Sequence, residues 1–254
     1  MTNGQILALL AASAGAGVMN ALAGGGTLLT FPVLVLLGLP SIQANATSTV
    51  ALLPGAAASM AGYRRELAAH REWLKTLLFP SVAGGAIGSM LLLRTPENTF
   101  RQLAPFLVLF ATLLFLLQAV LFRHTGVRSQ GPRHASRMLP AMACQLGVAI
   151  YGGYFGAGIG ILMLVILGFL GVEDIHAANG LKNFFAICIN GVAASYFIVR
   201  GAVIWPAALV MILGASAGGY AGAHLARRIG RGRARVAVVV IGFAITGAML
   251  WQRH

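Results

Sequence analysis

Long apolar stretches separated by short polar or basic connections dominate the chain. A helix needs about 20 largely apolar residues to cross a bilayer. Eight stretches come close to that length: Ile6–Ala23, Ile42–Tyr63, Leu74–Leu93, Leu103–Phe122, Met138–Phe155, Ile175–Val199, Val203–Ala226 and Ala234–Trp251. The pattern therefore predicts an all-α, polytopic membrane protein.

Two further apolar pieces, Thr27–Leu39 and Ile161–Gly171, are too short to cross as full helices. Each of them follows a glycine cluster, Gly24–Gly26 in the first case and Gly156–Gly160 in the second. Glycine weakens a helix because it has no side chain to restrict its backbone. We therefore expect a short, broken membrane segment after each cluster.

Composition supports a membrane protein and argues against a soluble one. Of the 254 residues, 58% are hydrophobic and 9% are charged, against about 25% charged in an average soluble domain. The formal net charge of +13 would suit a nucleic-acid binder. Here, however, the basic residues form short clusters between long uncharged stretches, so we expect no nucleic-acid partner.

The basic clusters indicate how the chain is oriented. Most of the 18 Lys and Arg residues lie in three connections: Arg64, Arg65, Arg71 and Lys75; Arg123, Arg128, Arg133 and Arg137; Arg227, Arg228, Arg231, Arg233 and Arg235. The positive-inside rule places such connections on the cytoplasmic side. All three reach that side only if both short pieces cross. We therefore predict eight full spans and two short broken ones in the cytoplasmic (inner) membrane, with both termini outside.

Similar motifs recur in the two halves of the chain in the same order. Ser81–Gly88 resembles Ala215–Gly222, and Gly24 and Gly26 match Gly158 and Gly160. With five segments in each half, the second half enters the membrane in the opposite sense, as in many secondary transporters. We predict an inverted repeat, 1–125 and 138–254, joined by a basic cytoplasmic linker, 126–137. The alternative is chance similarity among Ala/Gly-rich helices.

The GGxxG patterns within Ser81–Gly88 and Ala215–Gly222 place small residues on one face of a helix, where they permit close helix packing. This packing could occur within the chain or between two copies, so a homodimer through these faces is one expectation. Direct contact with a substrate is the alternative.

The candidate site lies around the two glycine clusters, because transporter sites tend to form where a helix is broken near the midplane. The candidate binding residues are Asn20, Gly25, Gly26, Thr27, Asn45, Thr47 and Ser48 in the first half and Asn179, Lys182 and Asn183 in the second. The hydroxyls and amides among them can donate hydrogen bonds to an oxyanion. Thr47 and Ser48 could instead bond backbone carbonyls one turn earlier.

The ionisable residues point to an anionic substrate. No Asp or Glu lies deep in a predicted span, whereas Lys182 lies about two turns inside one, and an intramembrane charge is a functional candidate. The helix N-termini at 42–48 and 175–183 would add positive dipole ends. Lys182 could instead reach the membrane surface or pair with Glu173 or Asp174. His176 is either an ordinary helix-end residue or a proton-coupling group.

Two motifs carry a family resemblance. Asn20–Pro32 followed by Ala44–Ser48 closely resembles the first-half signature of the TauE/SafE sulfite-exporter family, and Asn179–Asn183 with Ile189–Ala194 resembles its second-half stretch. The resemblance implies a transporter of sulfite, organosulfonates or related anions. The second half has Gly158-Ile-Gly160 without a following proline, so we do not expect two equivalent half-sites.

Secondary transport of a small anion by alternating access is the function that we predict. An anion channel is an alternative, and an intramembrane enzyme is a weaker one. We find no HExxH motif, no Ser/His/Asp set and no clustered carboxylates. We therefore expect no catalytic residues, no metal and no cofactor. Without an ATP-binding motif, transport would depend on ion or substrate gradients.

Overall fold

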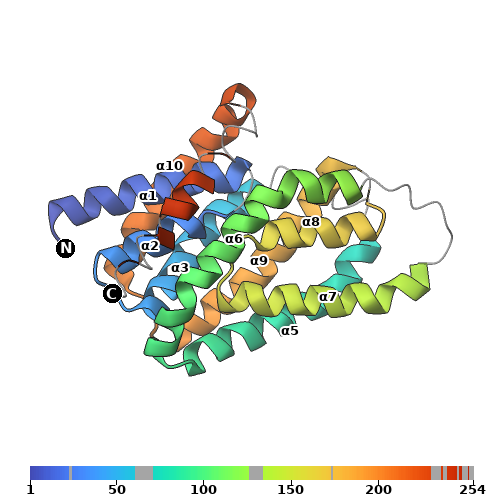
Figure 1. Ribbon diagram of the computed structural model, residues 1–254, viewed down its shortest axis with the longest axis horizontal. Coiled ribbons are helices and arrows are strands. Elements are labelled where there is room, and N and C mark those ends of the chain that lie inside the picture. Colours follow the sequence, from blue (N-terminus) through green and yellow to red (C-terminus); the bar gives the residue numbers. More distant parts are fainter. Residues whose placement is uncertain are drawn as a thin grey trace.

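The computed structural model describes residues 1–22, 25–60, 71–125, 134–172, 174–229, 236, 239–244, 246, 247 and 251. All regular structure among these residues is helical, which confirms the predicted all-α class. The helices labelled in Figure 1 are α1 (Asn3–Leu22), α2 (Thr27–Leu36), α3 (Ser41–Met60), α5 (Arg71–Arg94), α6 (Glu97–Thr125), α7 (His134–Tyr154), α8 (Ile159–Phe169), α9 (Ile175–Val199) and α10 (Trp205–Ile229).

The two short segments form separate short helices, as the glycine clusters predict. Helices α2 and α8 have 10 and 11 residues. At about 1.5 Å per residue, each covers roughly half of a hydrocarbon core about 30 Å thick. Three described segments are long and apolar enough to cross a membrane, namely Arg71–Arg94, Glu97–Leu117 and Ala177–Val199. The last predicted span, Ala234–Trp251, is described only in part.

Close contact at glycine joins α5 to α7. A Cβ atom added at Gly88 would lie 2.1 Å from the Ile150 carbonyl oxygen, and one added at Gly84 would lie 2.5 Å from the Ala149 Cβ. Residue numbers rise together along the contact, so the two helices run in parallel. Only a residue without a side chain permits backbones to approach this closely.

Helices α1 and α10 meet in the same way. A Cβ atom at Gly218 would lie 1.9 Å from the Ala14 carbonyl oxygen, and one at Gly17 would lie 2.2 Å from the Ala215 carbonyl oxygen. Gly84, Gly85, Gly88 and Gly218 are buried against other helices of the same chain. The buried glycines of the GGxxG motifs are therefore used for packing inside the chain, and a homodimer through these faces stays a prediction.

The short helices are largely buried among the longer ones, with α2 in the left part of Figure 1 and α8 in the right part. Helix α2 packs against α1 and α3, and α8 packs against α6, α7 and α9. Aromatic rings fill the space between these elements, with Phe31 of α2 contacting Phe155 at 5.3 Å and Phe100 of α6 at 6.2 Å between ring centroids. The hydrophobic core thus surrounds the ends of the short helices.

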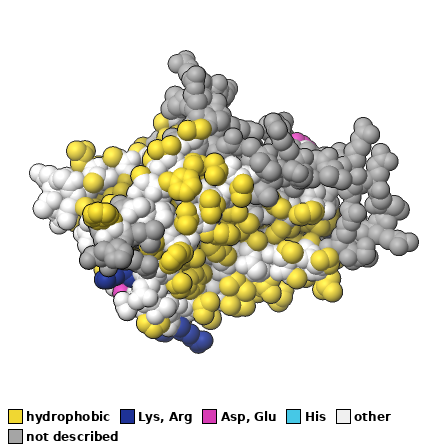
Figure 2. Space-filling view, in the orientation of Figure 1, with side chains coloured by type: hydrophobic (Ala, Val, Ile, Leu, Met, Phe, Trp, Pro, Cys, Tyr) yellow, Lys and Arg dark blue, Asp and Glu magenta, His cyan; other side chains and the backbone are white. Residues whose placement is uncertain are grey.

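The outer surface of the molecule is apolar along its long helices. Figure 2 shows hydrophobic side chains over much of the visible face. On α6 the exposed apolar residues recur every three or four positions, at Leu103, Phe106, Phe110, Leu113 and Leu117. Such a stripe on a solvent-facing helix would be costly in water but suits contact with lipid.

Candidate functional site

The two chain breaks that precede α2 and α8 meet the same segment of α6. Gly25 has φ +95°, and a Cβ atom there would lie 2.3 Å from the Phe115 ring. Gly158 has φ +78°, and a Cβ atom there would lie 3.4 Å from Leu114 and 3.5 Å from Ala111. The left-handed backbone at both glycines disfavours any side chain. The fold therefore brings the two predicted breaks together beside residues 111–115.

Hydrogen bonds organise the first break. Asn20 Oδ1 accepts the Gly26 backbone N–H at 2.8 Å, and the Thr30 hydroxyl donates to the Gly26 carbonyl at 3.2 Å. The Ser48 and Thr30 hydroxyl oxygens lie 2.6 Å apart, and both residues are buried. Because Thr30 donates to Gly26, Ser48 donates to Thr30. Helix α2 begins at Thr27, the residue after Gly26.

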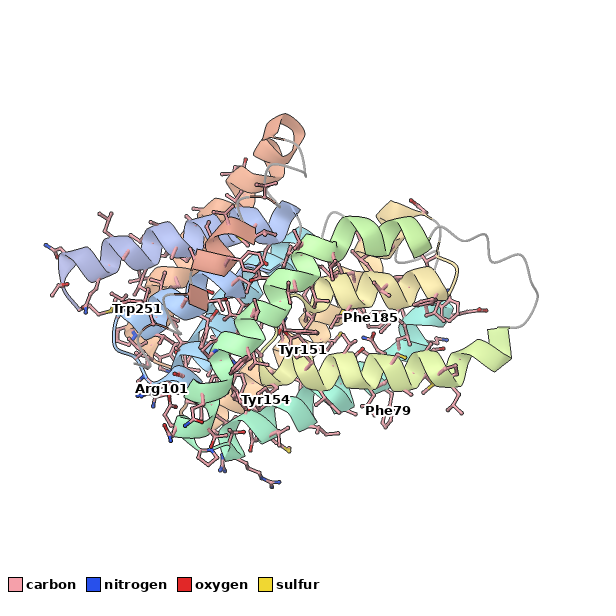
Figure 3. All side chains as sticks on the ribbon, in the orientation of Figure 1. Phe79, Arg101, Tyr151, Tyr154, Phe185 and Trp251 are labelled. Carbon is pink, nitrogen blue, oxygen red and sulfur yellow. The ribbon has the colours of Figure 1, made fainter. Side chains whose placement is uncertain are left out.

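A second set of bonds holds the break between α7 and α8. The Tyr151 hydroxyl donates to the Ala157 carbonyl at 2.7 Å, which closes the turn between the helices. Asn45 of α3 donates through Nδ2 to the Tyr154 carbonyl at 3.0 Å. Figure 3 shows Tyr151 and Tyr154 at the inner end of α7, where their rings contact Phe110 and Phe100 of α6. Asn45 therefore links the first half of the chain to the break in the second.

Two threonines of α3, Thr47 and Thr49, also have protein partners. The Ile204 backbone N–H donates to Thr47 Oγ1 at 3.0 Å. Thr49, rather than Thr47 or Ser48, bonds the carbonyl one turn earlier, that of Asn45, at 2.9 Å. In this structure the Ser48 hydroxyl and one N–H of the Asn45 amide are thus engaged by protein oxygens, and the amide of Asn45 has a second N–H. Binding of an anion by these residues stays a prediction.

The N-terminus of α3 differs from expectation. We expected its positive end to face a substrate, but the Glu97 carboxylate occupies it. Glu97 accepts the backbone N–H of Ser41 and, at 3.1 Å, that of Ile42. This residue stands at the start of α6, and nothing in the local sequence of either helix indicates the pairing.

Lys182 lies inside the protein. Its side chain is only 7% exposed, and its ammonium donates to Asn179 Oδ1 at 3.2 Å. The alkyl part passes the second residue of α8, because a Cβ atom at Gly160 would lie 3.2 Å from Lys182 Cδ. Lys182 therefore does not extend to the exposed surface, and it approaches the N-terminal turn of α8. The adjacent Asn183 is half-buried.

The electrostatic character of this region is positive. The N-cap of α8, Gly158, receives no side-chain capping bond, and a helix N-terminus carries partial positive charge. The described carboxylates, those of Glu72, Glu97 and Asp174, are exposed. The side chain of His176, the proton-coupling candidate, lies outside the described residues. A buried cation beside an uncapped helix start is an arrangement that favours an anion.

The comparisons with known proteins agree with this architecture. The chain matches the sulfite exporter TauE/SafE family over residues 9–249. It is 28% identical to a protein of Haemophilus influenzae named "Probable membrane transporter protein", covering 94% of this chain and 91% of that one. It is 27% identical to the "Probable membrane transporter protein YfcA" of Escherichia coli K12, covering 94% of this chain and 87% of that one.

No solved structure gives a significant match to the chain. The family match covers nearly the whole sequence, including both helix breaks and the helices that surround them. The two relatives are named as probable membrane transporters, and the matches cover most of the length of each. This chain belongs to the sulfite exporter TauE/SafE family.

Proposed function

We propose that this protein is a secondary transporter of a small anion, either sulfite, an organosulfonate or a related sulfur-containing oxyanion. One half of the chain would rock against the other to give alternating access to a site at the two helix breaks. The family assignment supports transport. Lys182 of α9, buried beside the start of α8, is the observation that carries the choice of an anion.

The helix contacts support two inverted repeats as the moving parts. Helix α5 packs in parallel along α7, and α10 packs in parallel along α1. In the proposed repeat, α5 corresponds to α10 and α7 corresponds to α1, so one contact is the counterpart of the other. The contacts of α3 with α10 and of α9 with α5 also correspond.

A further correspondence involves the last segment of each half. Thr112 of α6 and Thr246 are counterparts, and each hydroxyl donates to the carbonyl four residues earlier, at 2.8 Å. A Cβ atom added at Gly242 would lie 2.2 Å from Thr112 Oγ1, so the two segments cross at these positions. A two-fold relation between the halves predicts such a crossing.

The anion would bind where Lys182 and the first turn of α8 come together. Burying a charge in hydrocarbon costs several kcal/mol in typical cases, and a nearby group of opposite sign lowers that cost. Asn179 supplies one acceptor for the ammonium, and an amide oxygen carries no net charge. A bound anion would add negative charge beside the ammonium and accept from the N–H groups of the helix start.

Replacing Lys182 tests this function. In proteoliposomes, Lys182→Met should lower the flux of radiolabelled sulfite at least tenfold, because it removes the charge and keeps most of the apolar stem. Lys75→Met is the matched control, since Lys75 is the other lysine of the chain and is exposed on α5. It should leave the flux within about twofold of wild type. Equal flux in both variants would remove Lys182 from the site.

An anion channel is the second candidate, and counterflow separates the two. A carrier exchanges substrate faster when unlabelled substrate is present on the opposite side, because the loaded protein returns more quickly than the empty one. We expect such trans-stimulation here. Flux that rises linearly with concentration and shows no trans-stimulation would support a channel instead.

A further inference from the structure

In the side-chain amide of Asn45, the nitrogen has a hydrogen-bond partner and the oxygen has none among the described residues. Its Nδ2 group donates to the Tyr154 carbonyl at 3.0 Å. A carbonyl can pair only with the NH₂ end of an amide, so this bond fixes the orientation of the side chain. Oδ1 therefore points the other way. It is buried, and no hydrogen-bond donor among the described residues reaches it.

The nearby hydroxyl groups of α2 and α3 do not donate to Asn45 Oδ1, because each donates its hydrogen to another oxygen. Ser48 donates to Thr30, which donates to the Gly26 carbonyl. Thr49 donates to the backbone carbonyl of Asn45 itself. Buried acceptors are nearly always paired in folded proteins, and leaving one unpaired is costly. The position of Asn45 Oδ1 thus calls for a donor from outside these residues.

The second half of the chain shows what kind of group such an oxygen receives. Asn179 and Lys182 follow Asn45 and Ser48 at the same spacing along the chain as Gly158 follows Gly24 in the proposed repeat. Asn179 Oδ1 accepts from the Lys182 ammonium at 3.2 Å. In the first half, the residue three positions after the asparagine is a serine that turns toward Thr30. The two half-sites therefore differ: one amide oxygen has an internal donor, and the other is open.

We infer that Asn45 Oδ1 accepts a hydrogen bond from the substrate, so that the protein binds its oxyanion as a hydrogen-bearing monoanion and discriminates against the fully ionised dianion. This inference rests on the proposed function, and it makes Asn45 a specificity-determining residue. The unprotonated form has only acceptor oxygens, which the Asn45 oxygen would repel. The substrate would then carry its own proton across the membrane.

Binding measured across pH tests the inference on the wild-type protein. Above the pKa of hydrogen sulfite, the protonated fraction falls tenfold for each pH unit. The apparent Kd for total sulfite should rise by the same factor. Methanesulfonate is a permanent monoanion without a donor. It should bind about tenfold more weakly than hydrogen sulfite, equivalent to about 1.4 kcal/mol, and show no such trend.

Two variants test whether Asn45 causes the preference for hydrogen sulfite over methanesulfonate. Asn45→Leu is close in size but has no acceptor, so its Kd values for hydrogen sulfite and methanesulfonate should agree within about twofold. Asn179→Leu is the matched control, because its oxygen already has an internal donor. It should weaken both probes alike and keep the pH trend for sulfite. A merely structural role of Asn45 would lower both affinities without changing their ratio.

The outcomes separate this inference from the proposed function. A flat wild-type profile for sulfite would assign the acceptor to a bound water and overturn the inference, while anion binding would stand. A pH trend that persists in Asn45→Leu would also overturn it. Failure of both probes to bind wild-type protein at any pH would overturn the proposed function together with this inference. The wild-type measurement does not depend on whether a variant folds.

Discussion

Single glycines set the distances between the helices of this molecule. At Gly88, the nearest atom to an added Cβ would be a backbone oxygen of α7, which cannot move aside as a flexible side chain can. At Gly147, on the same helix pair, an added Cβ would meet nothing within 4 Å. Substitutions at Gly88 and Gly147 therefore distinguish the effect of close helix packing from the lower helix propensity that glycine has at any position.

Gly88→Ala should destabilise the protein by about 1–3 kcal/mol, because the added methyl forces α5 and α7 apart. Gly147→Ala should leave stability unchanged or raise it by about 0.5–1 kcal/mol, because alanine has the higher helix propensity. Thermal unfolding of both variants in detergent gives the comparison. A similar Tm for the two variants would contradict the close contact between α5 and α7.

Residue types predicted the neighbourhood of the site better than they predicted its bonds. Asn20 and Ser48 were expected near the first break, and the structure places both there. Thr30, which joins them, was not predicted, because a threonine inside an apolar run carries no signal of its own. Asn45 was expected to donate to an anion, and the bond of one of its two N–H groups to the Tyr154 carbonyl was not predicted. Such a pairing depends on how distant segments meet.

At the scale of elements, α3 is anchored at its beginning by a residue from another helix. The Glu97 carboxylate accepts the first two N–H groups of α3, and Asn45, Thr47 and Ser48 follow within the next two turns. A carboxylate at a helix N-terminus both satisfies backbone donors and opposes the positive end of the dipole. The first turn of α6 therefore positions the site residues of α3.

Glu97→Gln should lower stability by about 1 kcal/mol, because an amide has a single neutral oxygen where the carboxylate has two charged ones. Glu72→Gln, in the exposed first turn of α5, should change stability less. Comparison of the two Tm values at low ionic strength gives the measurement. An equal effect of both substitutions would show that the Glu97 cap contributes nothing beyond the loss of a charge.

Local composition predicts individual helices well in this chain. The predicted bounds of Ile175–Val199 coincide with those of α9, and α2 begins at Thr27 as predicted. Helix α8 begins at Ile159, inside its glycine cluster and two residues before the predicted Ile161. Which helices pair could not be predicted in the same way. The GGxxG motifs indicated close packing but not the partner, because the glycine face is equally suited to α7, α1 or a second copy.

At the scale of the whole molecule, the beginning of α1 and Trp251 lie toward one end of the long axis, and the beginning of α7 lies toward the other (Figures 1 and 3). This arrangement fits a chain whose termini share one side of the membrane. The basic connections predict that this side is the outer one.

Labelling of introduced cysteines tests the orientation. In a background with Cys144 and Cys188 replaced by alanine, Thr2→Cys should react with a membrane-impermeant maleimide in spheroplasts. Arg128→Cys, in the basic linker, should react only after lysis. The reverse pattern would invert the predicted topology, and labelling of both in intact spheroplasts would place the termini and the linker on one side.

The parallel contact of α1 with α10 has a consequence for biosynthesis. Ala14 contacts Gly218, and α1 is synthesised long before α10, the helix that covers its small-residue face. Helices α5 and α7 are made much closer together in time. We therefore expect the α5–α7 body to assemble first during insertion, with α1 held in lipid or by a chaperone. A chain truncated before α10 should expose α1 to the quality-control proteases of the membrane.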